Sequence, residues 1–221
     1  MKDTGRVTRP GAPLTSLFER AVGRAATPGP ATADDERVYE AAMRVLAERG
    51  TRTATMDDVA AAAGIGRATL FRRFGGKDAV FEAAIAHTLR AFLTEIATTF
   101  LTVTDPTERI TEGFLACLRL RRRFLAADAD VTRTGELLAM LSAGDPSPLD
   151  TGHRFIAAHI VAGQSEGVLP QADPDIRADA IIRLTLGYLV LPHTRYDLDD
   201  EAVARRIARR AIAPLITGRP S

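Results

Sequence analysis

Cysteine and aromatic residues are scarce in this chain, and each shortage excludes a class of protein. The 221 residues include one cysteine, no tryptophan and 5% aromatic residues. A single cysteine forms no intrachain disulfide, which argues against an exported, disulfide-stabilised domain and favours the cytoplasm. Alanine is abundant and runs of β-branched or aromatic residues are few, so the composition favours helices over a sheet.

Long apolar runs and an excess of one charge are also lacking. No run approaches the roughly 20 residues that span a bilayer, and no apolar segment of a signal peptide precedes Arg20. We therefore expect neither a signal peptide nor a membrane partner. The formal net charge is +1, so any surface that attracts a polyanion must be a local one.

Patterns of catalysis and metal binding are missing too. No hydrolase elbow, phosphate-binding loop, paired cysteines or zinc-protease motif occurs. His153 and His159 are six residues apart, about 240° around a helix, so they do not share a face for a metal ion. The sequence predicts no enzyme, no catalytic residue, no metal and no cofactor.

The chain divides into an arm and two helical regions. Residues 1–31 are rich in glycine and proline and carry five basic and two acidic residues, which predicts a flexible basic arm, although 14–25 could form a short helix. After this arm the apolar residues recur at helical spacing, and no segment shows the alternating apolar and polar pattern of a strand. The sequence thus predicts an all-α fold, with an N-terminal head at 32–85 joined to a larger helical domain at 86–217. The predicted helices are 32–50, 55–64, 67–74, one from 77, 107–123, 130–142, 148–167, 173–191 and 199–216, the last disturbed at Pro214.

Residues 55–77 have the pattern of a helix-turn-helix. Two short helices meet at Gly64, a residue that tolerates the positive φ where the first helix stops. Ala60 and Ala63 let the helices cross closely, and apolar anchors such as Leu70 hold the second helix. The remaining residues of that helix are expected to face outward. They are Arg67, Ala68, Thr69, Phe71, Arg72 and Arg73.

The outward face is basic. Between Arg67 and Lys77 four residues are basic and none is acidic. Arginine reads guanine edges and grips phosphates, and Lys77 at the start of the next helix would add a phosphate clamp. Two capped helices around a glycine occur in many helical proteins, however, and an arginine pair is usually a solvated face.

Residues 33–85 resemble the DNA-binding domain of the tetracycline-repressor (TetR) family. The matching pattern is Thr55-x-x-x-Val59-Ala60-x-x-Ala63-Gly64-Ile65-x-x-x-Thr69-Leu70-Phe71-x-x-Phe74-x-x-Lys77-Asp78. The resemblance implies a three-helix DNA head, a ligand-binding and dimerisation domain, and repression relieved by a small molecule. It implies DNA contacts at Thr55, Arg67, Ala68, Thr69, Phe71, Arg72, Arg73 and Lys77. Gly66 stands where the family often has a serine N-cap, and Phe71 replaces the commoner tyrosine.

The last two predicted helices are the candidates for a homodimer interface. Their apolar stripes include Ile182, Leu186, Leu189, Val203, Ile207, Ile212 and Leu215. An intrachain core is the alternative. Arg205, Arg206, Arg209 and Arg210 could form a second nucleic-acid patch, but we expect a solvated face paired with Asp199, Asp200 and Glu201.

An effector pocket is expected among the central helices. Its candidate residues are Phe100, Phe114, Cys117, Leu118, Leu138, Met140, Phe155, His159 and Tyr188, which could equally be plain core. The function predicted from the sequence is a DNA-binding transcriptional regulator. As a repressor it would be released from a double-stranded DNA operator by a small apolar or amphipathic effector. The alternative is a helical scaffold or interaction protein that has lost specific DNA binding.

Overall fold

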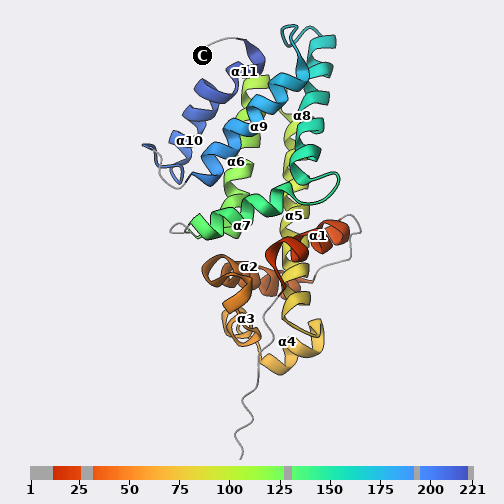
Figure 1. The fold of residues 1–221 in the computed structure, drawn as a ribbon, viewed down its shortest axis with the longest axis vertical. Helices are drawn as coiled ribbons and strands as arrows, with labels where there is room; N and C mark the ends of the chain where they lie inside the picture. The colour runs from red at the N-terminus through yellow and green to blue at the C-terminus, as the bar shows by residue number, and fades with distance from the viewer. Residues whose placement is uncertain (1–11, 26–31, 127–130, 192–194, 219–221) are drawn as a thin grey trace, which may run out of the picture. The chain divides into compact units, whose positions relative to one another are not determined.

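The computed structural model describes residues 12–25, 32–126, 131–191 and 195–218, which form helices and connecting turns without a strand. The predicted all-α fold class is confirmed. The helices, in chain order, are α1 (Leu14–Ala25), α2 (Ala33–Thr53), α3 (Met56–Ala63), α4 (Arg67–Phe74), α5 (Lys77–Thr102), α6 (Pro106–Phe124), α7 (Val131–Ser142), α8 (Pro148–Ser165), α9 (Pro174–Val190), α10 (Glu201–Ile207), η1 (Ala208–Ile212) and α11 (Pro214–Thr217) (Figure 1). None of them is long and apolar enough to cross a membrane.

The chain forms two compact units, 1–87 and 88–221, and α5 runs from the first into the second. In the first unit, two capping boxes set where helices begin. The Thr32 hydroxyl accepts the Asp35 amide and the Asp35 carboxylate accepts the Thr32 amide, and Thr55 and Asp58 repeat the arrangement at α3. Each box satisfies amide groups that a helix start leaves without a partner.

The N-terminal segment differs from the predicted arm. Residues 14–25 form α1, whose Leu17 and Ala21 are fully buried, and Arg20 pairs with Glu82 of α5 at 2.9 Å. The apolar face of this short helix therefore packs into the first unit instead of extending away from it. The rest of the predicted arm, 1–11 and 26–31, lies outside the described residues.

The larger unit has a core built around α6. Ile110, Phe114 and Leu118 on α6 pack with Ile160 of α8 and Ile181 of α9. The segment predicted as one helix over 199–216 is instead α10, the wide π turn η1 and α11. Pro214 has no N–H to continue the α-helical ladder, and the Ala213 amide bonds five residues back to Ala208 at 2.8 Å.

Candidate functional site

The turn between α3 and α4 has the geometry that the sequence predicts. Gly64 ends α3 with φ 68°, and the Ile65 amide donates to the Ala60 carbonyl at 3.0 Å. Val59 and Leu70 are completely buried, so one face of each helix is held in the core of the head. The opposite face of α4 is left to solvent.

The centre of that outward face is Ala68 and Arg72. At 100° per residue both side chains lie roughly 160° around α4 from buried Leu70. Phe71 lies on one flank and Thr69 on the other, and all four side chains are exposed. Phe71 is 58% exposed, unusually high for an aromatic ring. The surface therefore combines one arginine, a methyl group, a hydroxyl and an apolar ring.

The arginines of α4 differ in their partners. Arg67 pairs with Asp57 at 2.7 Å, with both side chains exposed. Arg73 lies 2.5 Å from the Asp35 carboxylate and donates to the Thr32 hydroxyl at 2.8 Å. Arg72 has no ion pair or hydrogen bond with any described residue. The basic strip predicted from the sequence thus leaves Arg72 as its most available guanidinium.

Lys77 is held differently from the predicted phosphate clamp. Its ammonium donates to the Thr51 carbonyl at 2.9 Å and the Ala54 carbonyl at 3.0 Å, where α2 ends. A helix C-terminus carries partial negative charge, so a cation is stabilised there. These carbonyls come from residues more than twenty positions away, which the local sequence pattern could not reveal.

The first turns of α3 and α4 are capped unequally. Thr55 uses its hydroxyl in the capping box, and that hydrogen bond, with burial opposing it, lowers the pKa of Asp58. Gly66 provides no side-chain cap for α4, as the sequence predicts. Helix α4 consequently begins with backbone amide groups that find no hydrogen-bond acceptor in a capping side chain.

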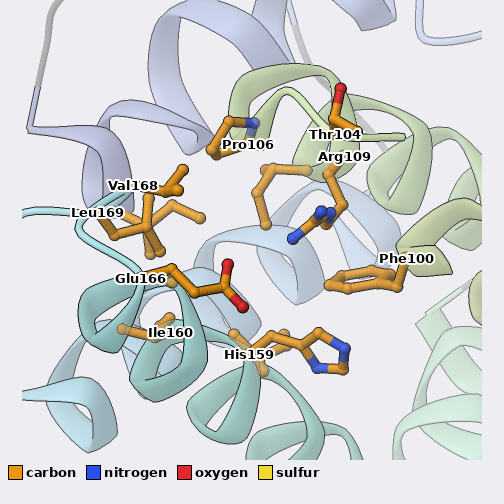
Figure 2. Close-up of a pocket in the computed structure, with 13 residues that line it drawn as sticks. Phe100, Thr104, Pro106, Arg109, His159, Ile160, Glu166, Val168 and Leu169 are labelled. Atoms are coloured by element: carbon orange, nitrogen blue, oxygen red, sulfur yellow. The ribbon is translucent and has the colours of Figure 1, made fainter. Parts of the chain in front are cut away.

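A cavity of about 220 Å³ lies within the larger unit (Figure 2). Its walls come from α5, α6, α8, the turn after α8, and α11. The lining residues are Phe100, Thr104, Pro106, Arg109, Ile110, Ile156, His159, Ile160, Gly163, Glu166, Val168, Leu169 and Ile216. Gly163 is tightly packed, since a Cβ atom there would lie 2.8 Å from Leu169 Cδ1.

Figure 2 shows the Arg109 guanidinium and the Glu166 carboxylate pointing into the same space, with Phe100 beside them. Arg109 donates from Nε to the Val103 carbonyl at 2.9 Å and lies 5.7 Å from the centre of the Phe100 ring. The His159 ring is 4.5 Å from that of Phe100, and its Nδ1 donates to the Phe155 carbonyl at 2.8 Å. The Val103 carbonyl and the Phe100 ring together hold the guanidinium at the cavity wall.

Of the predicted pocket residues, Phe100 and His159 line the cavity. Phe155 stands beside them, 4.7 Å from Phe100 between ring centres. The others lie elsewhere. Phe114, Leu118 and Met140 are buried, Tyr188 packs edge-on against Phe114, and Leu138 is 41% exposed.

Cys117 is partly buried and packs against the core cluster of the larger unit. Burial, reinforced by the charge of Glu95, raises the pKa of its thiol to about 12. The thiol therefore stays protonated and poorly nucleophilic near neutral pH. This agrees with the packing role expected from its apolar sequence context.

Of the cavity residues that were not predicted from the sequence, Arg109 and Glu166 are the charged ones. Two acids lie near Arg109 in the sequence, Glu108 directly before it and Glu112 three residues later. This pattern suggests an ordinary solvated ion pair. Both acids instead pair with arginines of the C-terminal segment, Glu108 with Arg209 and Glu112 with Arg205. Only the tertiary structure reveals that Arg109 is left facing the cavity.

The apolar residues predicted to form the dimer interface are mostly buried within one chain. Leu189, Ile207 and Ile212 are buried in the core of the larger unit, and Leu215 packs against it. An apolar stripe has the same period whether it faces its own core or a second copy. The other predicted interface residues, Ile182, Leu186 and Val203, are half-buried.

Comparisons with known proteins agree with this architecture. Residues 38–84 match the model of the bacterial regulatory proteins of the tetR family. An uncharacterised HTH-type transcriptional regulator of Mycobacterium tuberculosis is 26% identical over 188 residues, which cover 82% of this chain and 85% of the relative.

Two solved structures have a similar fold. The fatty acid degradation regulator FadR of Bacillus halodurans is 17% identical with a TM-score of 0.57, covering 83% of this chain and 98% of that one. AibR, solved with isovaleryl coenzyme A and operator DNA, is 16% identical with a TM-score of 0.56 and the same coverage. With its helix-turn-helix head, whose residues 38–84 match the tetR family, and its larger helical unit, the chain is a DNA-binding transcriptional regulator.

Proposed function

We propose that the chain binds an operator with α4 in the major groove and reads it chiefly through Ala68 and Arg72. The observation that carries this proposal is the outward face of α4, where an unpaired arginine and a methyl group lie opposite buried Leu70. Arginine suits a guanine edge and a methyl group suits thymine. Phe71 and Thr69 on the flanks would contact sugars, phosphates or a thymine methyl.

Operator binding by such heads requires two copies, and we propose a homodimer formed through α8 and α9. Exposed apolar side chains on these helices and the turn between them support this surface. They are Val161, Val168 and Ile176, which are 48%, 54% and 69% exposed. Two helices from each copy would then form a four-helix interface.

We further propose that a small effector in the cavity near Phe100 and His159 releases the regulator from DNA, which makes it a repressor. AibR, of similar fold, was solved with isovaleryl coenzyme A and operator DNA. Such a regulator acts where the chromosome lies, which favours the cytoplasm, and it needs no catalytic step. The rival reading is a helical scaffold that no longer binds specific DNA.

Band-shift titration with the DNA upstream of the reading frame tests the DNA-binding role. We expect one palindromic region to bind far more tightly than sheared DNA, with affinity falling steeply as salt rises. Equal binding to all sequences, or indifference to salt, would favour the scaffold.

Light scattering of Ile176→Glu tests the dimer, because a charge in a buried apolar interface should give monomers. An unchanged dimer would place the interface elsewhere.

A further inference from the structure

The charged groups of the cavity indicate the chemistry of its ligand. Arg109 and Glu166 both line it, yet no ion pair joins them or links either to another described residue. Beyond its Nε bond and its contact with Phe100, Arg109 has two terminal nitrogens without a partner in the described part of the chain. A guanidinium with two free donor groups is suited to a carboxylate.

The availability of Arg109 follows from the pairing around it. Glu108 lies 2.8 Å from Arg209, and Glu112 lies 2.6 Å from Arg205. These two ion pairs occupy the acids nearest to Arg109 in sequence. Neither acid is left to pair with Arg109, whose Nε donates to the Val103 carbonyl, and Figure 2 shows its guanidinium beside the Phe100 ring.

The walls of the cavity are amphipathic. Ile160, Leu169 and Ile216 are buried and supply an apolar floor, whereas Thr104 and Glu166 are exposed and mark the rim. A ligand that satisfies both surfaces has an apolar body on the floor and its polar group near Arg109. The volume of about 220 Å³ corresponds to roughly seven water molecules at about 30 Å³ each, so the body is short.

We propose that this cavity binds a small monocarboxylate whose carboxylate accepts hydrogen bonds from Arg109 and whose short aliphatic body packs on the apolar floor. The proposal rests on the proposed effector site and names its ligand class. Glu166 sharpens the selection, because its negative charge facing the same space disfavours a second carboxylate or a phosphate. The pair of opposite charges thus selects one negative charge per ligand.

Calorimetry of the full chain without DNA tests the ligand class. We expect pentanoate to bind at least about tenfold more tightly than n-pentanol, n-pentylamine or glutarate, which share its length but change its charge. Equal binding of the alcohol or the amine overturns the proposal. Failure of pentanoate to bind, with operator binding intact, overturns it as well and leaves the DNA-binding role standing.

Variants test the assigned residue. Arg109→Met should weaken pentanoate binding at least about tenfold, whereas Arg206→Met, outside the cavity, should leave it unchanged. Arg109→Lys keeps the charge without the two-pronged donor and should give an intermediate loss. If Arg109→Met fails to fold by circular dichroism, Arg109→Lys decides, and wild-type affinity in a folded variant overturns the assignment.

Discussion

Two arginine-rich segments of this chain pair some of their arginines with acids in the same way but differ in the scaffold that carries them. In α4, Arg67 and Arg73 pair with acids of the head, and in the segment of α10 and η1, Arg205 and Arg209 pair with acids of α6. Two of the three arginines of α4 and two of the four in the C-terminal segment are therefore paired. The difference lies in the scaffold, since Arg72 projects from a short helix of a helix-turn-helix. Local charge alone does not distinguish a reading surface from a solvated one.

The largest effect is expected when the unpaired arginines of each segment are replaced. Arg72→Ala should weaken operator binding by about 1–3 kcal/mol, roughly five- to 150-fold, because it removes the proposed guanine contact. The double variant Arg206→Ala/Arg210→Ala should change it less than about twofold, measured by band shift at one salt concentration. A comparable loss in both would mean that the C-terminal segment also contacts DNA.

A second comparison is between Lys77, a cation that stabilises the fold, and Arg206, a cation that is solvated. Lys77→Met removes the hydrogen bonds to Thr51 and Ala54, and we expect the free energy of unfolding to fall by about 1–2 kcal/mol. Urea titration followed by circular dichroism measures the loss. Arg206→Met is the matched control and should stay within about 0.5 kcal/mol of wild type. Unchanged stability of Lys77→Met would return Lys77 to the role of phosphate clamp.

The ion pair of Arg73 should make the head sensitive to acid. Burial acts to raise the pKa of Asp35, but hydrogen bonds from Thr32 and Arg73 outweigh it, so the pKa lies below its ordinary value. A lowered folded-state pKa contributes stability above the ordinary carboxyl pKa and loses it as pH falls through the lowered value. We expect Asp35→Asn to reduce amide-exchange protection of α2 by about 1 kcal/mol near neutral pH.

That difference between wild type and Asp35→Asn should shrink as the carboxylate of the wild type becomes protonated. Hydrogen exchange followed by mass spectrometry resolves it for the head alone, without the larger unit. A constant difference across the acid range would show that Arg73 and Thr32 do not stabilise the charged form of Asp35.

The smallest effect is expected in the C-terminal segment. Arg205→Gln removes ion pairs with Glu112 and Glu201, whose side chains are partly exposed, and solvent screens such pairs. Thermal unfolding should therefore shift by no more than corresponds to about 0.5 kcal/mol. A larger loss would indicate that the pairing with α6 organises the larger unit, including the surroundings of Arg109.

The features that the sequence predicts well depend on neighbours in the chain. Thr32 and Thr55 begin helices with acids three residues later, and Gly64 ends α3, as expected from local pattern. The partners of Lys77 and Arg73 lie 23 to 41 residues away and required the folded structure. The local sequence pattern gives the type of each side chain, but tertiary packing decides which hydrogen-bond or ion-pair partners that side chain has.

The larger unit shows the same limit. Phe100 and His159 could be selected because aromatic and amphipathic residues on central helices are common in pockets. Ile207 and Ile212 were assigned to a dimer interface and lie in the core instead, because apolar periodicity does not identify the partner surface. The acids predicted to face the C-terminal arginines were right only for Glu201, since Asp199 pairs with Arg122 and Asp200 caps α10.

The close packing of Gly163 against Leu169 has a consequence for how this regulator can change over evolution. A single methyl group at residue 163 would meet Leu169 Cδ1 at 2.8 Å and Cγ at 2.9 Å, so the leucine would have to move. Both residues line the cavity, whereas the polar end of the cavity is set by Arg109. One codon change is therefore expected to alter the length of ligand that the proposed effector site accepts, while Arg109 keeps the charge preference proposed for it.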